Sequence, residues 1–380
     1  MKILYITSFF NIKGSSAAVR NAGLVKGLVE NGHIVDVLTL KYPENKTSHL
    51  FSKIKCNKIY YTDLPITDSI QKNRKYLHFI NNSFVRSLKN FIRDFIYFPD
   101  VWKDWYKHVN PKDFSHYDII ISSSDSISSH YVGKSIKSKN LNLRWIQVWG
   151  DPWTIDVSRN VVTKLRAKRK EKKLILEADK VIYVSELTQK FMAKKYQSFS
   201  DKIFYVPRSF FQKVESLKRN EDTIDIVYMG SLNINRKIDD FLDDISIYND
   251  KNDRKIKLYL YGEYSESILD ILSKYNFVNI YSTVDYEEVL DIFSKSSLLL
   301  FIGNKVGATQ IPGKLFDYLG TNLPIICITT DKNLISFLSK YKNCLIYDSD
   351  ISTIVDKILY HKFDSVDEFS PTIVATKVLE

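Results

Sequence analysis

Short apolar runs recur along the whole chain, and stretches with apolar residues at helical spacing separate many of them. Such runs, without regular polar alternation, are typical of parallel strands that are buried on both faces. In the first half they predict strands at residues 2–7, 33–40, 118–122, 143–149, 181–184 and 203–206. In the second half they predict strands at residues 225–229, 256–261, 278–281, 298–302, 324–328 and 344–347.

This alternation of strands and helices predicts the fold class α/β, with two Rossmann-like, doubly wound parallel sheets in series. At 380 residues the chain is long enough for two domains that each bury a core. We place the boundary at Pro207, giving domains 1–207 and 208–380, with the last helix a candidate to pack back on the first domain. Ligands of such sheets bind at the carboxyl ends of the strands, so we expect the domains to face a cleft.

Residues 298–328 combine a strand, a glycine-containing loop and a helix that begins near Pro312. A glycine-rich turn before a helix N-terminus offers unpaired N–H groups to an anion. Lys314 adds a positive charge there, and Asp317, one turn later, can accept hydrogen bonds from sugar hydroxyls. The glycine spacing fits neither the Walker A motif nor the dinucleotide fingerprint. A phosphate beside a ribose would suit this arrangement.

Three segments resemble GT-B glycosyltransferases of the large retaining group, the group-1 type found in bacterial surface polysaccharide biosynthesis. Pro-Gly-Lys-Leu-Phe-Asp-Tyr-Leu at 312–319 resembles the C-terminal signature, with Pro-Ile-Ile following in register. Glu-Ala-Asp-Lys-Val-Ile-Tyr-Val-Ser-Glu at 177–186 is similar to a strand that ends the family's first domain. Gly230-Ser231-Leu232, followed by Arg236, is similar to the pattern Gly-Ser-Leu-x-x-x-Arg.

The resemblance covers nearly the whole chain and implies a set of donor-binding residues. It implies that Arg236 contacts the donor diphosphate, that Lys314 lies near it and that Asp317 binds the ribose. The remaining predicted donor-side residues are Gly230, Ser231 and Gly262, which follow strands, and Gly313, in the loop before the helix. The sequence departs from the family pattern at two places. Asp317 stands where the family has a glutamate, and the family's other signature glutamate would fall near residues 309–310, which are threonine and glutamine here. We expect a nucleotide sugar, with a UDP-sugar favoured, as co-substrate and no metal, because basic groups neutralise the leaving diphosphate in such enzymes.

The first domain carries the candidates for catalysis and acceptor binding. Gly14 and Ser15 lie in the loop after the first strand, where the family has a glycine loop; the alternative is an ordinary strand–helix turn. Asp125 is a catalytic candidate or a plain helix cap, and His130 is a catalytic candidate or a surface histidine. The turn Gly-Asp-Pro-Trp-Thr, with Asp151, resembles the family's Arg-Asp-Pro-Trp-Thr. Asp151 ranks above Asp125, because a residue at the carboxyl end of a strand points into the cleft; the alternative is a turn carboxylate that caps the next segment.

The charge is divided unevenly between the two halves. Residues 1–200 hold 34 Lys and Arg against 17 Asp and Glu, whereas residues 201–380 hold 21 against 27. The basic half predicts a partner rich in phosphate, such as an anionic membrane surface. The amphipathic stretch 79–97 suits either a core helix or an interfacial one, and the basic run 164–173 either a solvated helix or one lying against lipid headgroups. No nucleic-acid-binding motif is present, so we expect no nucleic-acid partner.

The three cysteines show no paired spacing, no apolar run approaches the length of a membrane span, and the first residues do not resemble a signal peptide. We therefore expect a cytoplasmic enzyme, peripheral at the inner face of the membrane. The predicted activity is that of a hexosyltransferase acting on a saccharide or lipid-linked acceptor. Retention at the anomeric carbon is implied by the resemblance alone. The alternatives are a non-catalytic protein on the same fold and a basic nucleic-acid-binding protein.

Overall fold

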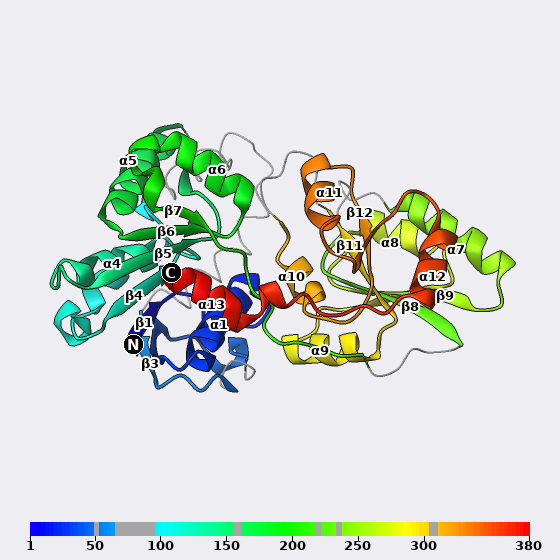
Figure 1. Cartoon of the computed structure of the whole chain (residues 1–380), viewed down its shortest axis with the longest axis horizontal. Coiled ribbons are helices and arrows are strands. Elements are labelled where there is room, and N and C mark those ends of the chain that lie inside the picture. The colour runs from blue at the N-terminus through cyan, green and yellow to red at the C-terminus, as the bar shows by residue number, and fades with distance from the viewer. Residues whose placement is uncertain (49–52, 65–95, 156–160, 217–221, 233–237, 304–310) are drawn as a thin grey trace. The chain divides into compact units, whose positions relative to one another are not determined.

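The computed structural model describes the chain except for residues 49–52, 65–95, 156–160, 217–221, 233–237 and 304–310. The chain divides into two compact units, one of residues 1–207 with 374–380 and one of residues 208–373. Each unit is built on a single parallel sheet, which confirms the predicted α/β class (Figure 1). Three features singled out above lie outside the described residues: Arg236, positions 309–310 and nearly all of the amphipathic stretch 79–97.

The sheet of the first unit has seven parallel strands in the order β3-β2-β1-β4-β5-β6-β7. Their bounds are β1 Lys2–Ile6, β2 Ile34–Leu40, β3 Lys58–Thr62, β4 Ile119–Ser123, β5 Arg144–Trp149, β6 Lys180–Tyr183 and β7 Ile203–Tyr205. The α-helices between them are α1 Ser16–Glu30, α4 Ser128–Lys137, α5 Val161–Glu177 and α6 Glu186–Lys195. The described part of the unit also contains short 3-10 helices: η1 Glu44–Lys46, η4 Trp105–His108, η5 Pro111–Phe114, η6 Trp153–Ile155 and η7 Gln197–Lys202.

Strand β3 is the element that the sequence analysis missed. It pairs with β2 at the edge of the sheet, and its middle residues are only partly buried, with Tyr61 49% exposed. Because an edge strand needs no continuous apolar run, the segment Lys-Ile-Tyr-Tyr-Thr does not show the pattern of the central strands. Its aromatic and β-branched residues, which are enriched in strands, were the feature of the sequence that could have predicted this strand.

The last residues of the chain, 374–380, belong to the first unit and end helix α13, Pro371–Leu379. Lys180 of β6, whose side chain lies under this helix end, donates from Nζ to the carbonyl oxygens of Lys377 and Val378, at 3.1 Å each. Arg144 donates to the carbonyl of Leu379 at 2.7 Å. Two cations thus satisfy carbonyls that a helix C-terminus leaves without partners.

The sheet of the second unit has six parallel strands in the order β10-β9-β8-β11-β12-β13. Their bounds are β8 Thr223–Met229, β9 Lys255–Tyr261, β10 Val278–Tyr281, β11 Leu298–Ile302, β12 Ile325–Ile328 and β13 Cys344–Ile346, at the predicted places. The helices are α7 Asp239–Lys251, α8 Glu266–Leu272, α9 Tyr286–Lys295, α10 Lys314–Leu319, α11 Lys332–Leu338, α12 Ile351–Tyr360 and η8 Asp367–Phe369. None of the described helices of the chain is long and apolar enough to cross a membrane.

Candidate functional sites

In each sheet there is one pair of neighbouring strands after which the chain continues toward opposite edges of the sheet. In the first unit this switch point lies between β1 and β4, and in the second between β8 and β11. The loops that follow such strands diverge and leave a crevice at their carboxyl ends, where ligands of open α/β sheets bind. Asp125 and the loop with Gly14 and Ser15 lie at the first of these places, and Gly230 and Lys314 lie at the second.

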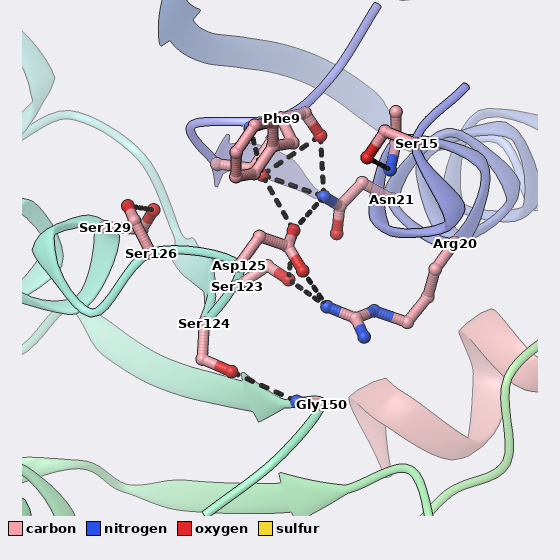
Figure 2. A network of polar contacts seen from close by, with 12 residues as sticks. Phe9, Ser15, Arg20, Asn21, Ser123, Ser124, Asp125, Ser126, Ser129 and Gly150 are labelled. Atoms are coloured by element: carbon pink, nitrogen blue, oxygen red, sulfur yellow. Dashed lines mark hydrogen bonds and ion pairs between the residues drawn. The ribbon is translucent and has the colours of Figure 1, made fainter. Parts of the chain in front are cut away.

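At the first switch point, Asp125 is the centre of a polar network (Figure 2). It follows β4, and its side chain is only 3% exposed. Arg20 and Asn21, which reach over from α1, both donate to its carboxylate. The hydroxyls of Thr7 and Ser123 donate to the same group, each at 3.3 Å. Asp125 is therefore more than a helix cap, because it ties the ends of β1 and β4 to α1.

The neighbours of Asp125 are held in place by further hydrogen bonds. The amide of Asn21 donates to the carbonyl of Phe9 at 2.7 Å and accepts from the hydroxyl of Tyr5 at 2.9 Å. Burial, opposed in part by Arg20, raises the pKa of Tyr5 well above its ordinary value, so its hydroxyl stays a donor at neutral pH. The network fixes the start of the loop after β1, next to the predicted acceptor-side residues Gly14 and Ser15.

The two acceptor-side candidates have clear local roles. Gly14 has a φ of 65°, which side chains rarely adopt, and a Cβ there would meet nothing within 4 Å. The hydroxyl of Ser15 accepts from the backbone N–H of Ala18 at 3.2 Å and caps α1. The ordinary strand–helix turn considered for this loop thus accounts for Ser15, while the surroundings of Gly14 are open.

The turn that carries Asp151 is held at both ends. Its first residue, Gly150, donates its N–H to the hydroxyl of Ser124 at 3.0 Å. Near its end, Thr154 donates its hydroxyl to Glu171 of α5 at 3.0 Å. Between these anchors Asp151 is exposed at the end of β5. The side chain ranked highest by sequence is therefore accessible, whereas Asp125 is enclosed by its partners.

Glu171 was missed by the sequence analysis, because it stands within the basic run 164–173. Its side chain is fully buried, and it also accepts from Lys195 at 3.0 Å and from Tyr196 at 2.7 Å. The interpretation of this run as a solvated helix is therefore wrong at two positions, Ala167 and Glu171, which are both buried. The signal was its spacing, since Glu171 falls on the buried stripe of α5 with Ala167 and Leu174.

His130 does not lie at the surface. It is fully buried in α4, its Nδ1 lies 2.7 Å from the hydroxyl of Ser122, and its ring centroid lies 4.4 Å from that of Trp149. Burial lowers the pKa of His130 to about 3, which keeps the imidazole neutral at physiological pH. The expected surface position is wrong, and a side chain enclosed in this way is a poor candidate for contact with a substrate.

At the second switch point, Lys314 lies against the turn at Gly230, and Gly262 lies against the other side of that turn's backbone. A Cβ built on Gly230, which has a φ of 128°, would lie 2.5 Å from Lys314 Nζ. A Cβ on Gly262 would lie 2.5 Å from the carbonyl oxygen of Gly230. Lys314 Nζ donates to the hydroxyl of Tyr228 at 3.1 Å and stands 4.1 Å from its ring centroid. The structure thus brings together Gly230, Gly262 and Lys314, which are far apart in sequence.

The other predicted donor-side residues flank this cluster. Gly313 forms the N-cap of α10, directly before Lys314. Ser231 is exposed, and its carbonyl oxygen accepts from the hydroxyl of Tyr228 at 3.1 Å. Arg236 belongs to residues 233–237, outside the part of the chain that the structure describes.

The predicted binding of ribose by Asp317 requires an exposed carboxylate, whereas the structure shows an enclosed one. Its side chain is 9% exposed and accepts from Arg208 at 3.0 Å and from the hydroxyl of Tyr286 at 2.6 Å. Burial raises the pKa of Asp317, against the opposing effects of Arg208 and Tyr286. Each carboxylate oxygen thus has a partner inside the second unit, so a ribose hydroxyl would have to share or displace one of them. Sequence reasoning missed both partners.

Among the described residues, no group of three or more His, Cys, Asp or Glu side chains is placed to hold a metal ion. The chemistry available at the second switch point is instead that of a cation beside glycine backbone. Such a cation can attract a phosphate through its charge, whereas the N–H groups of Gly230 and Gly262 donate to the carbonyls of Tyr261 and Tyr281.

Comparisons with known proteins agree with this architecture. No protein-family model matches the sequence, and no curated protein sequence matches it. Among solved structures, Anabaena HepE in complex with UDP and glucose matches with a TM-score of 0.56 and 10% identity, over 100% of this chain and 94% of that chain. A UDP-N-acetylglucosamine 2-epimerase matches with a TM-score of 0.52 and 10% identity, over 99% and 90% of the two chains. AviGT4, a glycosyltransferase involved in avilamycin A biosynthesis, matches with a TM-score of 0.50 and 12% identity, over 100% and 96%.

At these identities the likeness concerns the fold. The matches span both units of the chain, each with its parallel sheet, and the predicted GT-B fold is confirmed.

Proposed function

We propose that this chain is a glycosyltransferase that moves a sugar from a nucleoside diphosphate sugar, with UDP as the first candidate, to a saccharide acceptor. The observation that carries the proposal is the meeting of Lys314 with Gly230 and Gly262 at the switch point of the second sheet. The two glycines allow Lys314 and the two turns to approach one another closely. The ammonium group supplies the charge that a diphosphate requires.

The proposed chemistry follows from that placement. The bond between the anomeric carbon and the diphosphate breaks, and the acceptor hydroxyl forms a new bond to the same carbon. Lys314, with Arg236 as its proposed partner, stabilises the negative charge that grows on the leaving diphosphate, without a metal ion. In a retaining reaction the departing diphosphate takes the acceptor's proton. An inverting reaction would need a protein base, and the exposed Asp151 suits that role better than the enclosed Asp125.

A ligand-binding screen tests the donor site. We would measure the thermal stability of the protein with UDP, GDP and dTDP and with their common sugar conjugates. Ligand that binds only the native state raises the melting temperature. We expect a rise with one nucleotide, a smaller rise for Lys314→Ala, and an unchanged rise for the control Lys295→Ala, whose side chain is 71% exposed. No rise with any nucleotide would contradict the proposal.

A second measurement separates transfer from the alternatives. We expect nucleoside diphosphate to be released from the matching sugar conjugate only when a saccharide acceptor is present. Bound donor without turnover would indicate a non-catalytic protein, and formation of an epimeric nucleotide sugar would indicate an epimerase.

We further propose a lipid-linked acceptor, a peripheral position at the inner face of the cytoplasmic membrane and a role in surface polysaccharide assembly, such as capsule or lipopolysaccharide. The support is the excess of cations in residues 1–200 and the outer face of α5. There Val162, Leu165 and Leu176 are 61%, 59% and 48% exposed among lysines and arginines, a composition that suits an anionic interface. Sedimentation with anionic vesicles at low salt tests this, and absence of binding would contradict it.

A further inference from the structure

Tyr228 holds the ammonium group of Lys314 near the carboxyl end of β8. Lys314 Nζ lies over the aromatic ring, 4.1 Å from its centroid, and donates to the hydroxyl of the same residue at 3.1 Å. The ring attracts the cation through its electron-rich face, and the hydroxyl does so through a charge-assisted hydrogen bond. The side chain of Tyr228 is fully buried in the core, so it offers both contacts from a fixed position.

The hydrogen bonds of Tyr228 have one possible direction. An ammonium group can only donate, and a carbonyl oxygen can only accept. The hydroxyl of Tyr228 therefore accepts from Lys314 and donates its single proton to the carbonyl oxygen of Ser231, at 3.1 Å. These two bonds join the cation to the turn that follows β8. Gly230 of this turn leaves the room that they need, since a Cβ there would lie 2.5 Å from Lys314 Nζ.

A second tyrosine fixes the helix that carries Lys314. Tyr318 follows Lys314 by four residues in α10, so the two side chains share one face of the helix. The register of β8 with β11 ends at Val227, and beyond it the hydroxyl of Tyr318 accepts from the backbone N–H of Met229 at 3.0 Å. The ring of Tyr318 is fully buried and packs edge-on against Phe293 of α9, with 5.4 Å between the centroids. Both ends of α10 are therefore anchored at the last residues of β8.

We propose that Tyr228 is a positioning residue for the transfer reaction, because its ring and hydroxyl hold the ammonium group of Lys314 where the leaving diphosphate develops its charge. This role rests on the proposed glycosyltransferase function, since the departure of the diphosphate is the step that needs the cation in place. A lysine carries its charge on a flexible stem. A charge that is already in place requires no rearrangement during the reaction, and the contacts with Tyr228 supply that order.

The kinetic test compares Tyr228→Phe, which keeps the ring and removes the hydroxyl, with Tyr228→Leu, which removes both contacts. The rate measured is the release of nucleoside diphosphate from the nucleotide sugar that the thermal screen selects, with a saccharide acceptor present. We expect kcat to fall roughly five-fold for Tyr228→Phe and roughly thirty-fold for Tyr228→Leu, with the KM for donor changed less than about three-fold. The matched control is Tyr248→Leu, which removes a buried tyrosine from α7 in the same unit and should change kcat less than about two-fold.

The background of Lys314→Ala separates positioning from a general loss of structure. If Tyr228 acts through Lys314, Tyr228→Phe should lower kcat in the otherwise wild-type protein and leave kcat unchanged in Lys314→Ala. Equal fractional losses in the two backgrounds would overturn the proposal, and so would an unchanged kcat in Tyr228→Phe and Tyr228→Leu. Tyr228→Phe nearly preserves the volume of the buried ring, so it decides the question even where Tyr228→Leu does not fold.

Urea melts of the same four proteins test the contact without any ligand. The shifts of the urea midpoint for Tyr228→Phe and Lys314→Ala should not add in the double variant, because each change removes the same interaction. Additive shifts in a protein that turns over donor would overturn the role of Tyr228 alone. Non-additive shifts in a protein that neither binds nor turns over any nucleotide sugar would overturn the proposed function, and with it the positioning role, while the contact between the two side chains would stand.

Discussion

Gly150 leaves the space that the guanidinium of Arg20 occupies. A Cβ at position 150 would lie 2.5 Å from Arg20 Nη1, and Arg20 itself donates to the enclosed carboxylate of Asp125. The turn Gly-Asp-Pro-Trp-Thr thus lacks a side chain at the point where an arginine from α1 reaches the end of β4 (Figure 2). Gly150 stands where the resembled pattern Arg-Asp-Pro-Trp-Thr has an arginine. The position of Arg20 requires a glycine there.

Gly150→Ala should therefore displace Arg20 from Asp125. Because the group in the way is the end of a flexible side chain, we expect a free energy of unfolding lower by only about 1 kcal/mol. The check is a thermal or urea melt, together with a crystal structure of the variant. A structure in which the contact between Arg20 and Asp125 persists would contradict this prediction.

Arg20→Met should cost more, because it leaves the nearly buried carboxylate of Asp125 without its cation. Arg20 is itself 14% exposed, so we expect a loss of about 2–4 kcal/mol rather than the larger values of fully buried pairs. In a double-mutant cycle, adding Asp125→Asn should recover part of that loss. Additive losses in urea melts would mean that the two side chains do not interact energetically.

Glu171→Gln should loosen the turn that carries Asp151. The buried carboxylate accepts from Thr154, Lys195 and Tyr196, and an amide can replace only part of these bonds. We expect a loss of about 2–4 kcal/mol. Hydrogen exchange should also become faster in the turn.

Glu177→Gln on the same helix is the matched control. Its ion pair with Lys134 is about one-third exposed on both sides, so its loss should stay below about 1 kcal/mol. Similar losses for both glutamates would refute a special role of Glu171.

Asp317 should make the stability of the second unit depend on pH. Its pKa in the folded protein is raised above 3.8, chiefly by burial, so the folded state holds this proton more tightly than the unfolded state. Its contribution is present at low pH and is lost as the pH rises through the folded pKa. The stability of wild type relative to Asp317→Asn should therefore fall as the pH rises above about 4, the ordinary pKa of the unfolded carboxyl group. Urea melts at several pH values measure this difference, and a constant difference would contradict it.

The fold was predictable because its central strands are buried on both faces, as the run Leu298–Ile302 illustrates. The site was predictable only in part. Lys314 and Gly230 were found from local patterns, but their proximity depends on the order of β8 and β11 in the sheet.

The partners of the candidate carboxylates could not be predicted from the sequence. Arg20 lies 105 positions from Asp125, and Arg208 lies 109 positions from Asp317. No local pattern encodes pairs at such separations, because the fold creates them. For the same reason the sequence suggested an open Asp317, whereas the structure shows it enclosed by Arg208 and Tyr286.

The most direct test of the central claim is the rate at which nucleoside diphosphate is released from the matching nucleotide sugar with an acceptor present. Wild type, Lys314→Ala and the exposed control Lys295→Ala would be compared at saturating donor, so that weaker binding does not mask the chemical step. Lys314 is proposed to stabilise charge that develops on the leaving group, and loss of such a contact typically lowers kcat by about 10²–10³-fold. We expect a fall of that order for Lys314→Ala and an unchanged rate for Lys295→Ala. Equal rates for all three proteins would contradict it.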